Sequence, residues 1–247
     1  MKNYDNVSSA LKATFDKKIA LLGGAGPWAS AYAHTTLIHL SQWDYGAVED
    51  ADYPEILHIS IPLKGFGAKG IEDPDLVRMQ LRDTFNLFSQ WGADLAVMAC
   101  NSLHTFYDDI STMSDITIVH LPRTGAEVVA QRGYKKVGVF CSESALKDNL
   151  HKDALQAHGI EAILPERDQQ NRINTLIKLI MGGDNTSALY QDFRKLTREF
   201  EAKGAQVILS GCTELSWLAT KAQPDMPIID CLNVALTKTL KLAARQP

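Results

Sequence analysis

Two cysteines occupy matching positions in this sequence, each at the end of an apolar run. Cys100 ends LAVMAC and is followed by asparagine and serine, whereas Cys212 ends VILSGC and is followed by threonine and glutamate. A thiol at the start of a helix meets unpaired backbone N–H groups and the positive end of the helix dipole, and both favour the thiolate. The same N–H groups can hold a carboxylate. Two such thiols on opposing lobes would enclose a small anion between them.

The residues after these two cysteines add hydrogen-bond donors at the same places. Asn101, Ser102 and Thr213 supply the amide and hydroxyl groups. The remaining cysteines, Cys141 and Cys231, also end apolar runs, and we interpret them as structural thiols because small thiols are commonly buried. Neither the four cysteines nor the seven histidines show the spacing of a metal site. The sequence therefore predicts no metal.

A glycine loop, GGAGP at residues 23–27, follows the first apolar run. Gly24 and Gly26 formally fit the start of a dinucleotide-binding fingerprint. That fingerprint requires an acidic residue at the end of the second strand to bind the ribose, and the second run ends Ile-Pro-Leu-Lys at 61–64. We therefore interpret the loop as a tight turn whose glycines line the cleft, with nucleotide binding as the less favoured alternative.

The elements that must position these groups alternate between strands and helices. Apolar runs predict strands at 17–24, 55–61, 93–100, 135–141, 160–165, 206–212 and 227–231, and a new unit begins at 117–122. Helical periodicity predicts helices at 25–43, 73–92, 123–132, 144–158, 170–183, 186–203 and 233–244, with short helices from Ser102 and Thr213. Such alternation predicts an α/β fold with parallel sheets flanked by helices.

The chain contains a weak internal repeat. KKIALLGG (17–24) resembles KKVGVFCS (135–142), and WGADLAVMACNS (91–102) resembles KGAQVILSGCTE (203–214). The repeat predicts two similar lobes with the active site in the cleft between them, since ligands gather beyond the carboxyl ends of parallel strands. The expected divisions are lobe 1 at 18–115 with the C-terminal helix at 226–247, lobe 2 at 116–225, and a polar leader at 1–17.

Composition narrows the class of protein. The chain has 247 residues, 45% of them hydrophobic and 22% charged, as expected of a globular protein with a sizeable core. A formal net charge of −4 gives no electrostatic reason for binding nucleic acid or an anionic membrane. The N-terminal segment lacks the apolar core of a signal peptide, so we expect a cytoplasmic protein with reduced thiols.

Four segments resemble the aspartate/glutamate racemase family, most closely its aspartate racemase branch. They are GGAGPWAS (23–30), ACNSLHTFYDDI (99–110), PERDQQNRIN (165–174) and KGAQVILSGCTEL (203–215). Glutamate racemases resemble the chain less, because they usually carry histidine where this sequence has Glu214. The resemblance implies a two-lobed racemase that needs no cofactor and uses two cysteines across a cleft. It also implies a homodimer, whereas the sequence itself does not fix the oligomeric state.

The resemblance assigns roles to individual residues. It makes Cys100 and Cys212 the catalytic pair, and it places Asn101, Ser102 and Thr213 on the substrate α-carboxylate. Supporting roles fall to His104, Glu214 and Ser142. For His104 and Glu214, helix caps or surface contacts are the alternative interpretation. Inversion at an α-carbon fits two thiols, because one group removes a proton from one face while the other delivers a proton to the opposite face.

The sequence departs from the family where the substrate side chain would bind. Lys64 stands where an arginine is common, and lysine lacks the bidentate fork of arginine. Around Met181 an apolar residue replaces an expected cation, and the segment 141–145 differs from the usual pattern. Lys64 is our predicted contact for a side-chain carboxylate, with a solvated loop lysine as the alternative. Racemisation is therefore better supported than the identity of the substrate.

The predicted function is racemisation of an acidic amino acid, aspartate first and then glutamate. One alternative is a related enzyme of the hydantoin racemase or maleate isomerase type, which also uses paired cysteines. Another is a small-molecule-binding homologue without catalytic activity. The contacts to the substrate side chain distinguish an amino-acid racemase from the first alternative. Exchange of the α-proton distinguishes it from the second.

Overall fold

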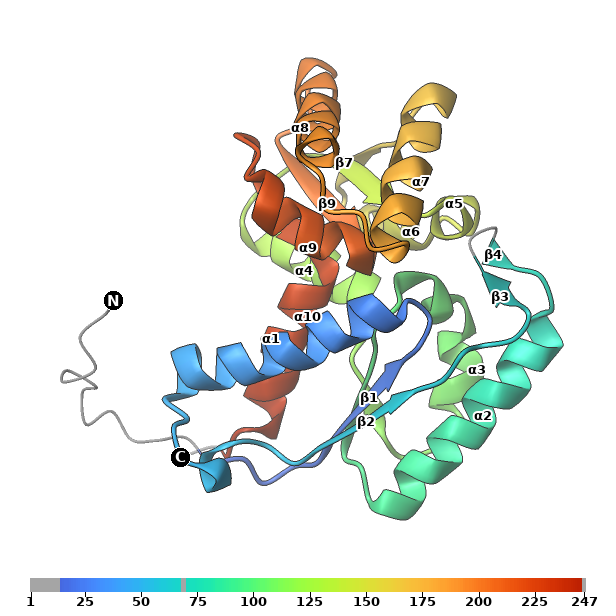
Figure 1. Ribbon diagram of the computed structural model, residues 1–247, viewed down its shortest axis with the longest axis vertical. Helices are drawn as coiled ribbons and strands as arrows, with labels where there is room; N and C mark the ends of the chain where they lie inside the picture. Colours follow the sequence, from blue (N-terminus) through green and yellow to red (C-terminus); the bar gives the residue numbers. More distant parts are fainter. Residues whose placement is uncertain (1–13, 68–69, 246–247) are drawn as a thin grey trace.

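The computed structural model describes residues 14–67 and 70–245. Two four-stranded parallel sheets form its two lobes (Figure 1). The first sheet contains, in spatial order, β2 (Ile56–Ser60), β1 (Ile19–Gly23), β5 (Leu95–Met98) and β6 (Thr117–Ile118). The second contains β8 (Glu161–Ile163), β7 (Lys136–Cys141), β9 (Val207–Gly211) and β10 (Ile228–Asp230). The strands of both sheets thus follow the same order, as the sequence repeat predicts.

The central strands of each sheet are buried on both faces. This burial explains why β1, β5 and β9 are nearly continuous apolar runs rather than alternating ones. In register, Leu22 pairs with Met98 in the first sheet, and Cys141 pairs with Gly211 in the second. The neighbouring strands therefore end together, and the loops that leave them gather at one edge of each sheet.

Helices connect and cover the strands. They are α1 (Pro27–Tyr45), η2 (Asp50–Asp52), α2 (Pro74–Trp91), η3 (Asn101–Phe106), α3 (Tyr107–Ser111), α4 (Leu121–Gln131), α5 (Glu143–Lys147), α6 (Leu150–Gln156), α7 (Arg167–Met181), α8 (Ser187–Ala202), α9 (Thr213–Ala222) and α10 (Cys231–Ala243). A short hairpin of β3 (Phe66–Gly67) and β4 (Gly70–Ile71) precedes α2. Within residues 14–67 and 70–245, none of the helices has the length and apolar character needed to cross a membrane.

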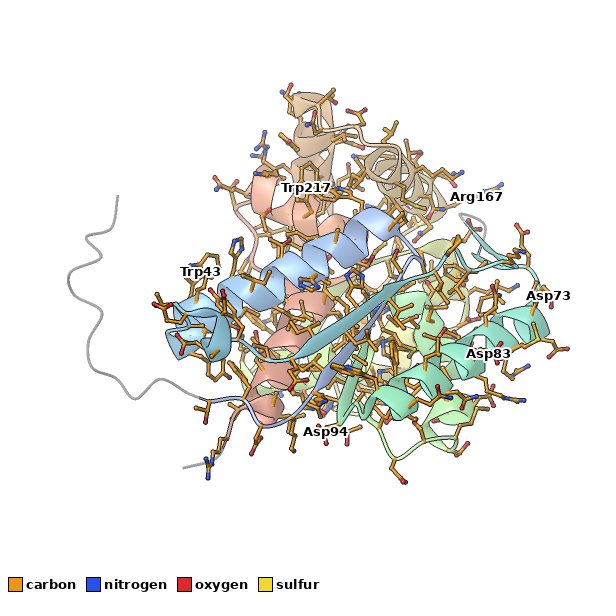
Figure 2. All side chains as sticks on the ribbon, turned by 60° about the horizontal axis from the view of Figure 1, so that its bottom comes forward. Trp43, Asp73, Asp83, Asp94, Arg167 and Trp217 are labelled. Carbon is orange, nitrogen blue, oxygen red and sulfur yellow. The ribbon has the colours of Figure 1, made fainter. Side chains whose placement is uncertain are left out.

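The lobes share one of their hydrophobic cores. This core contains Ile19 and Val97 of the first sheet together with Val139 and Leu209 of the second. Helix α10 links them, since it packs against both α1 and α4 and runs from one lobe into the other (Figure 1). The lobes also meet where Trp217 of α9, labelled in Figure 2, contacts Trp28 of α1 edge-on, with ring centroids 6.1 Å apart.

The predicted fold class is confirmed, but several boundaries differ from the predicted ones. Strand β6 pairs with β5 of the first sheet, although the second lobe was expected to begin at 116. Strand β10 pairs with β9 of the second sheet, whereas α10 packs against α1 and β5 of the first lobe. The helix expected at 144–158 is two helices separated at Asn149, which has a left-handed backbone. Most of the leader expected at 1–17 lies outside the described residues.

Candidate active site

Cys100 and Cys212 lie at the corresponding junction of each lobe. Cys100 follows β5 and occupies the N-cap of η3, and Cys212 follows β9 and occupies the N-cap of α9. Both have extended backbone geometry, with φ of −151° and −138°, and the next residue already belongs to the helix. Both cysteines line the same cavity of about 290 Å³. The structure thus brings the two predicted thiols to one site.

The cavity lies between the lobes, because both lobes contribute to its wall. The first lobe supplies the glycine loop after β1, the β3–β4 hairpin with the residues before it, and the start of η3. The second lobe supplies the loop after β7, the end of α7 and the start of α9. Of the residues predicted from the sequence, those that line the cavity are Gly24, Gly26, Cys100, Ser102, Ser142, Cys212 and Glu214.

Glu214 contacts one of the thiols directly. The Cys212 Sγ–H donates to Glu214 Oε2 at 3.1 Å, and the Thr213 hydroxyl lies 3.4 Å from the same oxygen. Glu214 is 6% exposed, and burial raises the pKa of its carboxyl group. The second oxygen, Oε1, lies against the α-carbon of Gly26 so closely that a β-carbon there would collide with it. The glycine loop of one lobe therefore packs on the carboxylate of the other.

We expect Gly26→Ala to lower activity on the order of 10²-fold, because the new methyl group must displace the Glu214 carboxylate from the thiol. Position 26 also has a left-handed φ of 87°, which costs a residue other than glycine about 1 kcal/mol. Gly46→Ala is the matched control: its φ is 69°, and nothing lies within 4 Å of the added carbon. Equal activity of the two variants, measured alongside their unfolding free energies, would contradict the role of this contact.

The thiols are less acidic than their helix positions suggest. Burial, followed by the charge of Glu214, raises the pKa of Cys100 to about 12, although N–H groups of Ser102 and Leu103 lower it. The same two causes raise the pKa of Cys212 well above its ordinary value. The decrease in thiol pKa predicted from the helix N-termini is thus present, but the effect of burial is larger. Removing an anion from water raises its free energy by more than a few N–H donors lower it. In the free protein both thiols hold their protons at neutral pH.

The predicted carboxylate-binding residues separate into two groups. Ser102 lines the cavity, and its hydroxyl hydrogen-bonds that of Ser142 at 2.9 Å, which links the two lobes beside Cys100. Asn101 and Thr213 are buried beside their cysteines but do not belong to the lining. The Asn101 Oδ1 pairs with His151 Nε2 at 3.1 Å, whereas its amide nitrogen has no partner among the described residues.

Lys64 and His104 do not line the cavity. Lys64 has an exposed side chain, and its backbone exchanges two hydrogen bonds with the Gln80 side chain, at 3.0 and 2.9 Å. His104 is buried and accepts a 3.4 Å bond from the Leu121 N–H, while its ring packs on His120 at 4.5 Å. Neither side chain therefore belongs to the lining of the cavity that contains the thiols, and the contacts expected of them stay predictions.

Several lining residues were not predicted. Phe66 and Ile177 reach the cavity from the hairpin and from α7, and Ser144 follows Ser142 on α5. Of the segments that supply these residues, the sequence indicated only the hairpin, through its closely spaced glycines at 65, 67 and 70. Nothing in the sequence indicated that His151 lies beneath Gly211 and Asn101, because only the folded chain brings α6 to β9. Among the described residues, no cluster of three potential metal ligands occurs.

The chain is similar to known racemases. Residues 45–239 match the family model described as Asp/Glu/Hydantoin racemase. The broad specificity amino-acid racemase RacX of Bacillus subtilis (strain 168) is 27% identical over 226 residues, which cover 90% of this chain and 97% of RacX.

Solved structures agree in fold. An aspartate racemase homologue from Pyrococcus horikoshii OT3 has a TM-score of 0.77 at 23% identity, with 92% of this chain and 99% of that chain covered. The Picrophilus torridus aspartate racemase has a TM-score of 0.76 at 19% identity, with coverages of 94% and 96%. Because the family model spans most of the sequence, the chain belongs to the Asp/Glu/hydantoin racemase family and is an isomerase of the racemase type.

Proposed function

We propose that the protein racemises a free α-amino acid without a cofactor, with Cys100 and Cys212 as the two acid/base groups. The observation that supports this proposal is that two thiols at helix N-cap positions, one from each lobe, line one small cavity. One thiolate removes the α-proton from one face of the substrate, and the opposite thiol donates its own proton to the other face. The groups exchange protonation states in each turnover, so either enantiomer can be the substrate.

The backbone at the two helix starts suits the substrate carboxylate. The N–H groups of the first turns of η3 and α9 lie beside the cavity that Cys100 and Cys212 line, and such groups suit the negative charge that develops when the α-proton leaves. The Ser102 hydroxyl, which lines the cavity, adds a donor on the side of Cys100. Donors fixed in advance stabilise the enolate-like transition state without reorganisation, which is the usual large contribution in such reactions.

A reactive thiolate has to form after the substrate binds, since burial holds the thiol pKa values high. Glu214 is the group placed to accept the Cys212 proton, because the thiol already donates to its carboxylate. Once Glu214 has taken the proton, the substrate ammonium group brings a positive charge next to the new thiolate, and opposite charge favours the ionised thiol. We therefore assign Glu214 as a positioning and proton-accepting residue for Cys212.

The expectation of an acidic substrate rests on the family resemblance alone. The contact predicted for its side-chain carboxylate, Lys64, is not among the lining residues. Aspartate and glutamate are therefore the first substrates to test, and the measurement decides which amino acid is the substrate.

The experiment that tests the function is proton exchange followed by chiral analysis. Purified protein with reduced thiols is incubated in D₂O with L-aspartate, L-glutamate and a panel of other L-amino acids, with no cofactor added. We expect loss of the α-proton NMR signal and appearance of the D-isomer for at least one amino acid. Activity on a 5-substituted hydantoin or on maleate, with none on amino acids, would favour the related isomerases. Thermal stabilisation by an amino acid without exchange would favour a binding homologue.

A further inference from the structure

The cavity that contains the thiols has two chemically different parts. Its polar residues lie at the starts of the helices that follow the strands, among them Ser102, Ser142 and Glu214. Its large apolar residues come from the β3–β4 hairpin with the residues before it and from α7, which lie on the same side of the molecule (Figure 1). An amino acid has the same division, with charged groups around the α-carbon and a side chain that points away from them. The polar part therefore suits the reacting end, and the apolar part suits the side chain.

Four large apolar residues form this second part. Leu63 and Phe66 belong to the first lobe, and Ile177 and Met181 lie one helical turn apart on α7 of the second. Leu63 and Ile177 are almost fully buried, whereas Met181 is 45% exposed and stands at the end of α7. Methionine adapts to different apolar shapes because its side chain is unbranched and flexible. The apolar part of the cavity therefore combines two buried side chains, Leu63 and Ile177, with the flexible side chain of Met181.

The charge of the described lining residues disfavours an acidic side chain. Among the described lining residues the one charged group is Glu214, and it is itself a carboxylate. A second carboxylate on the substrate would lose its hydration without gaining a cationic partner from these residues. The charge of Glu214 is also committed to the reacting end, since its oxygen accepts the bond from Cys212. It is thus placed at the reacting end of the substrate rather than beside a basic side chain.

We propose that the side-chain subsite formed by Leu63, Phe66, Ile177 and Met181 selects uncharged, largely apolar amino acids of about the size of leucine or methionine. This inference rests on the proposed function and gives it a substrate class. The cavity of about 290 Å³ lies at the lower end of the range for ligand pockets, which suits one small metabolite. Burial of aliphatic carbons against these four residues supplies the selectivity that an ion pair would supply for aspartate.

The test compares kcat/KM for α-proton exchange among L-methionine, L-leucine, L-aspartate, L-glutamate and L-lysine. We expect the two apolar substrates to exceed the three charged ones by at least about tenfold, the order of discrimination that apolar contacts provide. Preference for aspartate, glutamate or lysine would overturn this inference while leaving the proposed function intact. Exchange with none of the five, nor with the rest of the panel, would contradict the proposed function itself.

A charge placed in the subsite provides the second arm of the test. Met181→Lys should raise the ratio of kcat/KM for glutamate over that for methionine by at least about tenfold, because it gives a side-chain carboxylate a cationic partner. Leu179→Lys is the matched control: it adds the same charge on the same helix, at a residue that is 39% exposed and outside the lining. An equal change of the ratio in both variants, or none in Met181→Lys, would show that Met181 does not contact the substrate side chain.

Discussion

Replacing Cys100 or Cys212 by serine should lower the rate of racemisation by about 10³-fold or more. A serine hydroxyl is a far weaker acid than a thiol, so neither variant can form the anion that removes the α-proton or supply the proton on the opposite face. Each single substitution should therefore be nearly as damaging as the double substitution, because the two groups act as a unit. The measurement is the rate of D-isomer formation on a chiral column.

Cys231→Ala is the control for this pair. Cys231 is a fully buried thiol at the start of α10 and does not line the cavity. Its truncation should reduce stability by about 1 kcal/mol through the lost packing and should leave the rate unchanged. Full activity in either the Cys100→Ser or the Cys212→Ser variant would contradict the two-thiol mechanism.

Glu214→Gln should reduce activity on the order of 10²-fold and at the same time make the thiols more acidic. The activity falls because an amide cannot accept the Cys212 proton as a base. The pKa values of Cys100 and Cys212 fall because the negative charge that raises both is removed. A purely structural role of Glu214 would lower activity without this opposite change in thiol acidity.

The pH dependence of alkylation measures the second effect. In the wild type, the pKa of Cys100 of about 12 predicts slow reaction with iodoacetamide until strongly alkaline pH. In Glu214→Gln the alkylation profile should move to lower pH, since less alkali is needed to form the thiolate. Glu214→Asp keeps the charge and should retain the high wild-type profile while it draws the carboxylate away from the thiol. An unchanged profile in Glu214→Gln would contradict the electrostatic coupling.

The fold was predictable from the sequence because its strands are continuous apolar runs that end in glycine or polar turns. The errors lie where a local polar contact decides the boundary. The new unit expected at 117–122 begins with a strand of two residues, because the His120 ring accepts a 3.2 Å bond from the Arg123 N–H and starts α4 with Pro122 in its first turn. The break at Asn149 had no proline or glycine as a signal, and asparagine is one of the residues that tolerates a left-handed backbone.

The site was predictable only in part. Cys100, Ser102 and Cys212 lie within four residues of a strand end, so the rule that parallel strands end at one edge brings them to one cavity, as the structure does. Phe66 and Met181 lie far from these motifs in the sequence and reach the cavity through tertiary packing. The raised thiol pKa values were not predictable for the same reason. A helix N-terminus is a local feature of the sequence, whereas the burial that outweighs it depends on both lobes.

The central claim is that two different groups exchange protons with opposite faces of the α-carbon. The most direct test is the isotopic content of both enantiomers during the first few per cent of conversion in D₂O, measured by chiral separation and mass spectrometry. We predict that the D-product carries deuterium at the α-carbon from the first turnovers, while the remaining L-substrate keeps its protium. D-product that retains the α-protium of its substrate would show that a single group moves the proton between the two faces, and would contradict the two-thiol account.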